Sequence, residues 1–116
     1  MQTVAETHVY LRSAKDAGMS EAEMRAVVTY LAQNPEAGDL IVGSGGCRKV
    51  RVAGRGKGKS GGYRVVTFFG GGHMPLYLVW ALSKGQEENF SDAEVAQMHR
   101  MTKAIVAAYR RPRAVS

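Results

Sequence analysis

The strongest constraint on the fold is a pair of apolar runs joined by glycines. Residues 63–69 (YRVVTFF) and 75–82 (PLYLVWAL) are rich in aromatic and β-branched side chains, and residues 70–72 between them are all glycine. Such runs are typical of strands, and a short glycine-rich connection is typical of a β-hairpin. We therefore expect an antiparallel pair of strands at the centre of the domain.

A third strand is expected over residues 47–52 (CRKVRV), where basic and apolar side chains alternate. In a strand, the odd-numbered residues of this run share one face and the even-numbered residues share the other. Residues 2–5 indicate a further short strand near the N-terminus. Residues 39–46 (DLIVGSGG) are glycine-rich, and we expect them to be irregular.

Two helices are predicted before the sheet. Thr7 is a suitable N-cap for a short helix that continues to Lys15. Ser20 and Glu23 have the spacing of a capping box, and apolar residues recur after them at i, i+3, i+4 and i+7. Pro35 ends this second helix, because the residue before a proline is pushed out of the helical conformation.

A third helix is predicted after the sheet. Ser91 and Glu94 repeat the capping-box spacing, an apolar stripe follows, and Pro112 closes the pattern. A chain of 116 residues suits a single domain, here 1–116. The predicted fold class is α+β, with a small and mainly antiparallel sheet, two N-terminal helices and one C-terminal helix.

The charge of the chain is concentrated in its middle. Residues 40–86 contain eight Lys and Arg and no Asp or Glu, whereas residues 1–39 contain three basic and six acidic residues. A strongly positive surface attracts polyanions, of which nucleic acid is the commonest. The alternative is an evenly solvated basic face.

Several classes of protein are excluded by composition. No apolar run approaches the roughly 18 residues that cross a bilayer, so no membrane partner is expected. The single cysteine, Cys47, cannot form an internal disulfide and suits a reducing cytoplasm; we expect it to be a buried apolar residue rather than a nucleophile. One cysteine and three dispersed histidines predict no zinc cluster, and no metal site is expected.

Residues 53–62 (AGRGKGKSGG) are expected to form an exposed, mobile loop. Their glycines match G-x-G-x-x-G, but that motif binds phosphate only where a helix follows, and here a strand follows. No nucleotide cofactor is therefore expected. Glycines between cations instead favour binding to a phosphate backbone, single-stranded RNA above all. The chain has seven cations in this region: Arg48, Lys49, Arg51, Arg55, Lys57, Lys59 and Arg64.

The same cations are suited to cutting RNA, which carries its own nucleophile in the 2′-hydroxyl. An arginine can neutralise the charge of the transition state, and a lysine crowded by other cations can act as a base. Lys57, Lys59, Arg64 and Lys84 are the candidates; for each, the alternative is a phosphate clamp or a solvated cation. His73 is expected to be a solvated histidine in a turn rather than a general base.

The residues also resemble a known family. The segments NPEAGDLIVGSGGCRKVR (34–51), GRGKGKSGGYRVVTFF (54–69) and PLYLVWALSKGQ (75–86), with the later SDAEV, are similar to bacterial type II toxins of the RelE/HigB superfamily, above all its HigB-like branch. The resemblance implies a RelE/ParE-like fold: a small twisted sheet with helices packed on one side.

The resemblance also implies a ribosome-dependent endoribonuclease (an mRNA interferase) that cleaves mRNA at the decoding site and inhibits translation. Its implied partners are a cognate antitoxin, the ribosome and mRNA, with operator DNA bound only through the antitoxin complex. By position, Lys49 and Arg51 match basic strand residues that bind or activate RNA. Arg64 matches an arginine that stabilises the transition state, and Lys84 matches a basic residue at the end of the last strand.

The chain departs from the family pattern in two places. Gly85–Gln86 follows Lys84 where many relatives have Asn or Arg, and a tyrosine that some RelE proteins use near the C-terminus has no clear equivalent. These departures leave the assignment of the acid and base open. Two alternative functions also stay open. One is a ParE-like inhibitor of DNA gyrase, and the other is a non-catalytic nucleic-acid-binding subunit.

Overall fold

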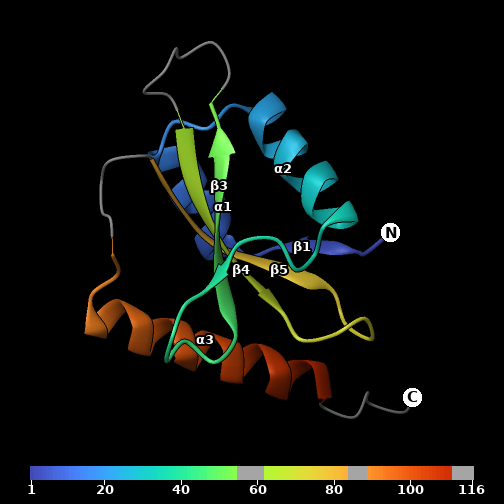
Figure 1. The fold of residues 1–116 in the computed structure, drawn as a ribbon, viewed down its shortest axis with the longest axis vertical. Helices are drawn as coiled ribbons and strands as arrows, with labels where there is room; N and C mark the ends of the chain where they lie inside the picture. Colours follow the sequence, from blue (N-terminus) through green and yellow to red (C-terminus); the bar gives the residue numbers. More distant parts are fainter. Residues whose placement is uncertain (55–61, 84–88, 111–116) are drawn as a thin grey trace.

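The computed structural model describes residues 1–54, 62–83 and 89–110. Its centre is one five-stranded sheet in the order β1-β5-β4-β3-β2, of which Figure 1 labels β1, β3, β4 and β5. All neighbouring strands are antiparallel except β1, which runs parallel to β5. The strands are β1 (Val4–Glu6), β2 (Asp39–Leu40), β3 (Cys47–Ala53), β4 (Gly62–Phe69) and β5 (Leu76–Ser83).

The predicted strands are confirmed, with one addition. The short strand at the N-terminus exists as β1, and the hairpin exists as β4 and β5. The additional strand is β2, within the segment that was expected to be irregular. It was missed because it is only two residues long, which is too short for a period-two pattern to be visible.

Within the described ranges, three helices pack against the sheet, and each begins where its capping signal predicts. They are α1 (His8–Asp16), α2 (Glu21–Gln33) and α3 (Asp92–Arg110). The Thr7 side chain accepts a hydrogen bond from the Tyr10 amide at 3.1 Å. Both capping boxes are formed: the Glu23 amide donates to the Ser20 hydroxyl at 3.1 Å, and the Ser91 amide donates to the Glu94 carboxylate at 2.8 Å.

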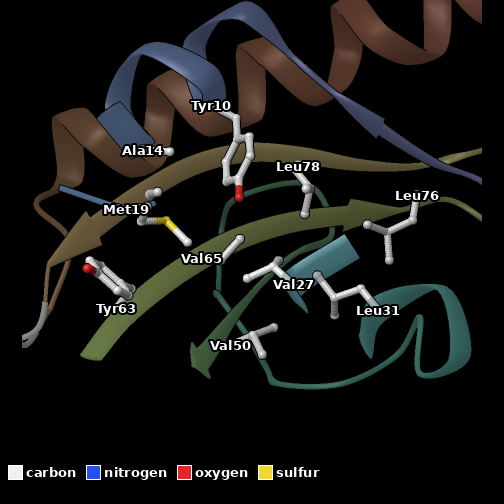
Figure 2. Packing of buried hydrophobic residues seen from close by; sticks show 11 residues of the cluster. Tyr10, Ala14, Met19, Val27, Leu31, Val50, Tyr63, Val65, Leu76 and Leu78 are labelled. Atoms are coloured by element: carbon white, nitrogen blue, oxygen red, sulfur yellow. The ribbon is translucent and has the colours of Figure 1, made fainter. Parts of the chain in front are cut away.

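The helices pack on both faces of the sheet, and the expectation that they share one side is wrong. Tyr10 of α1 and Leu31 of α2 pack with Val65 of β4 in one core (Figure 2). Met98 of α3 packs with Val66 of β4 in a second core. Since adjacent residues of a strand point to opposite faces, the two cores lie on opposite sides of β4. The apolar residues of β4 therefore hold helices on both faces.

The loop between β2 and β3 is held firmly against α3. Ser44 is fully buried, and its hydroxyl accepts a hydrogen bond from the Cys47 amide at 2.9 Å. The Thr102 hydroxyl of α3 donates to the Ser44 carbonyl at 3.3 Å. Gly45 lies against the same turn of the helix with a φ of +81°. Only a glycine combines this left-handed backbone with so close an approach.

Cys47 is buried with no exposed surface, as expected, and burial raises the pKa of its thiol to about 11. Across the described ranges, none of the helices is both long enough and apolar enough to cross a bilayer.

Replacing Gly45 by alanine should destabilise the protein. A Cβ atom there would lie 2.5 Å from the Thr102 hydroxyl oxygen, in a backbone conformation that alanine rarely adopts. We expect Gly45→Ala to lower the free energy of unfolding by about 2 kcal/mol, as measured by urea denaturation. Gly72→Ala is the matched control, because no atom lies within 4 Å of a Cβ there. Equal stability of the two variants would contradict this packing.

Tyr10 should make the fold sensitive to alkaline pH. Its pKa is raised to about 12, first by burial and then by the charge of Glu6. The neutral form therefore favours folding, and stability falls as the pH rises from about 10, where an unfolded tyrosine ionises, to about 12. Thermal melts of Tyr10→Phe should show a smaller loss over this range.

At neutral pH, the stability cost of Tyr10→Phe can be compared with that of Tyr63→Phe. The Tyr10 hydroxyl has no hydrogen-bond partner among the described residues, so Tyr10→Phe should cost little. The Tyr63 hydroxyl donates to the Gly18 carbonyl and the Glu23 carboxylate, each at 3.2 Å. Tyr63→Phe should therefore cost about 1–2 kcal/mol at neutral pH. Equal costs for the two variants would refute the difference in their contacts.

Candidate functional site

Three of the predicted cations meet on one face of the sheet. Lys49 and Arg51 alternate with Val50 along β3 and share the face that carries α3. Arg64 of β4 is the direct cross-strand partner of Arg51, and Val66 is the partner of Lys49. Directly opposed side chains have Cβ atoms about 5 Å apart. The two arginines are therefore close neighbours, with Lys49 beside them.

These side chains line a cavity of about 400 Å³ at the β2–β3 edge. Asp39 of β2 carries the one carboxylate among the described residues that line it, and it is the cross-strand partner of Lys49. The remaining lining comes from Val50, Gly38 and Tyr30, the last of these from the end of α2. Cations predominate, so the cavity is suited to an anion.

An arginine next to an exposed glycine-rich loop is expected to face solvent, but Arg64 is buried. Only 8% of its surface is exposed. The reason is its strand: β4 pairs with both β3 and β5, so Arg64 lies between Arg51 and Leu82. A buried arginine that lines a cavity has few accessible rotamers, which suits it to hold a phosphate in one orientation.

The structure does not bring Arg48 together with the other cations. It lies on the opposite face of β3, and its guanidinium donates to the carbonyls of Glu36 at 2.9 Å and Gly38 at 3.3 Å. These carbonyls belong to the connection between α2 and β2. Arg48 therefore braces the backbone behind the cavity.

The other four predicted cations, Arg55, Lys57, Lys59 and Lys84, lie outside the described residues, as does most of the expected mobile loop. The strand ends to which they are joined are described. Ala53 pairs with Gly62, and Tyr63 pairs with Ser83. The chain thus leaves β3, enters β4 and leaves β5 at the same end of the sheet, next to Arg64.

A buried hydrogen-bond network anchors the strand end that carries Arg64. The carboxylate of Glu23, which is 5% exposed, accepts hydrogen bonds from the Ser20 amide at 2.8 Å and from the Tyr63 hydroxyl at 3.2 Å. Burial raises the pKa of Tyr63, and the hydrogen bond to Glu23 raises it further. The N-terminus of α2 therefore fixes the residue directly before Arg64.

His73 does not belong to this site. Each strand residue advances about 3.3 Å, so Phe69 lies about 17 Å along β4 from Arg64. His73 is exposed in the turn beyond Phe69, and its carbonyl accepts a hydrogen bond from Tyr109 of α3. Its solvated position agrees with the expectation. Among the residues that the structure places, no group of three His, Cys, Asp or Glu side chains could hold a metal ion.

Tyr30 and Asp39 also line the cavity, but neither was predicted as a site residue from the sequence. Tyr30 is 46% exposed although α2 buries Val27 and Leu31. An aromatic residue outside the apolar stripe of a helix was the available signal. Asp39 lies just outside the acid-free segment and gave no comparable signal, because its place beside Lys49 depends on the unexpected strand β2.

Residues 2–112 match the family model described as the RelE toxin of the RelE / RelB toxin-antitoxin system. The chain belongs to the RelE toxin family. This RelE toxin is therefore the toxin of a toxin–antitoxin system, and an antitoxin is its partner. Toxins of the family are in general endoribonucleases. Its assignment to the HigB-like branch stays a prediction.

The direct cross-strand pairing of Arg51 with Arg64 should lower the stability of this RelE toxin. Like charges directly opposite each other in a sheet are destabilising. We expect Arg51→Gln to raise the free energy of unfolding by about 0.2–1 kcal/mol in urea denaturation at low salt. Arg25→Gln removes the same charge from the exposed surface of α2 and is the control. An equal gain in the control would show that only net charge matters.

Proposed function

We propose that this RelE toxin is a ribosome-dependent endoribonuclease that cleaves mRNA at the decoding site and thereby stops translation. The observation that supports it most is the cavity in which Lys49, Arg51 and Arg64 meet. The proposal extends to a cytoplasmic location, and to binding of operator DNA only through the antitoxin complex.

The proposed reaction uses the nucleophile that RNA supplies. The 2′-oxygen attacks the adjacent phosphorus and loses its proton, while the bond from phosphorus to the 5′-oxygen breaks and that oxygen takes up a proton. The products are a 2′,3′-cyclic phosphate and a 5′-hydroxyl. The reaction needs charge neutralisation and proton transfer, and the proposal includes no metal ion.

The proposed role of each cation in the reaction follows from its position. Arg64, which is buried between two strands, is proposed to neutralise the phosphorane through its rigid fork of donors. Lys49 and Arg51, which border it on β3, are proposed to bind the RNA backbone. Lys57 and Lys84 are proposed for proton transfer, and Arg55 and Lys59 for further backbone contacts.

The experiment is to add the protein to a translating extract and map the 5′ ends of a defined mRNA. Cleavage within the codon at the decoding site, with 5′-hydroxyl ends, would support the proposal. An mRNA with a 2′-deoxynucleotide at the cleaved position should stay intact, because it lacks the nucleophile. Intact mRNA with trapped gyrase–DNA adducts would support the ParE-like alternative instead. Binding of mRNA without cleavage would support a non-catalytic subunit.

Arg64→Lys should keep the charge and lose the fork of donors. We expect cleavage in the same extract to fall by about 10²–10³-fold, as is typical when a donor to the transition state is removed. Arg25→Lys, on the exposed surface of α2, should cleave like the parent protein. Circular dichroism of both variants checks that they fold. A folded Arg64→Lys variant that cleaves at the parent rate would contradict the role of Arg64.

A further inference from the structure

The cavity contains two residues that phosphate binding does not explain. Tyr30 is aromatic and 46% exposed, and Asp39 is an exposed carboxylate that would repel a phosphate. Both lie on the side of the cavity formed by α2 and β2, whereas the cations lie on β3 and β4. The two sides therefore differ in chemistry.

We propose that Tyr30 and Asp39 form a nucleobase subsite that binds guanine next to the phosphate-binding cations. An exposed aromatic ring offers a face on which a base can stack. A carboxylate only accepts hydrogen bonds, and the Watson–Crick edge of guanine carries two adjacent donors, N1–H and the N2 amino group. Adenine, cytosine and uracil each offer a single donor group there. The carboxylate thus matches guanine best.

Asp39 is available for this contact. Its side chain makes no hydrogen bond or ion pair in the part of the chain that the structure describes, although Lys49 is its cross-strand partner. A carboxylate that neutralised Lys49 would instead form an ion pair with it. Asp39 therefore keeps its acceptor oxygens for a ligand.

The backbone behind the subsite is rigid, as selective recognition requires. Arg48 donates to the carbonyls of Glu36 and Gly38, directly before Asp39. Gly38, with a φ of +93°, lies so close to β3 that a Cβ atom would be 2.4 Å from the Lys49 carbonyl oxygen. The Asn34 side-chain amide donates to the Tyr30 carbonyl at 2.9 Å and closes the end of α2. The backbone that carries Tyr30 and Asp39 is therefore held in place relative to the cations.

The proposal rests on the proposed function, and its test uses base preference as the readout. A set of mRNAs that differ only in one base of the codon at the decoding site is added to the translating extract with the protein. The parent protein should cleave best at a codon position that holds guanine. Asp39→Asn should reduce that preference by about tenfold, because an amide presents a donor where guanine needs an acceptor. A merely structural defect would lower cleavage of all codons equally.

The role of Tyr30 is tested with variants that keep or remove its aromatic ring. Tyr30→Phe and Tyr30→Trp keep a ring and should retain cleavage, whereas Tyr30→Leu keeps apolar bulk without a ring and should weaken it by about tenfold. Tyr109→Leu is the matched control, because Tyr109 is also 46% exposed but lies at the end of α3. It should cleave with the parent's base preference.

The outcomes separate the two proposals. If the parent protein leaves every mRNA intact, the endoribonuclease function fails and the subsite fails with it. If the parent cleaves but Asp39→Asn keeps the same base preference, only the subsite is overturned. A Tyr30→Leu variant that cleaves like Tyr30→Phe would equally overturn it.

Discussion

The structure depends on β4, the central strand, which is paired along both edges and covered on both faces. Its residues alternate between two cores: Val65 packs toward α1 and α2, and Val66 packs toward α3. Arg64 follows the same alternation and must face the side that carries α3. The second core includes Val66 and Phe68 of β4 but stops before Arg64. The guanidinium is thus placed where the apolar cover of the sheet ends, beside the cations of β3.

Hydrogen bonds outside the cavity fix the backbone segments that line it. Arg48 fixes the connection between α2 and β2 from the opposite face of β3. Glu23, at the start of α2, accepts a hydrogen bond from Tyr63 and fixes the start of β4. The connection between α2 and β2 and the start of β4 are therefore both attached to α2. This helix is itself packed into the first core through Val27 and Leu31. Apolar packing on one face of the sheet positions the charged side chains on the other.

Local signals in the sequence predicted the elements but not their arrangement. The capping boxes at Ser20 and Ser91 marked two helix starts, since a cap depends on four consecutive residues. The alternation along residues 47–52 predicted that Lys49 and Arg51 share a face, because this pattern also depends only on neighbouring residues. The burial of Arg64 depends on β4 being the central strand, and Asp39 reaches the site only through β2. Strand order, strand pairing and the face on which each helix packs are long-range properties. No local pattern in the sequence contains them.

The opposed arginines show how the fold accommodates a charged site. A sheet that placed Arg51 beside an acidic partner would be more stable, but such a partner would occupy the donors that a phosphate needs. The chain instead keeps residues 40–86 free of Asp and Glu and lets the two apolar cores offset the repulsion. Asp39 is consistent with this arrangement because it lies on β2, across β3 from Arg64. A carboxylate at that rim is separated from Arg64 by β3, so it can accept hydrogen bonds from a base that lies beside the phosphate.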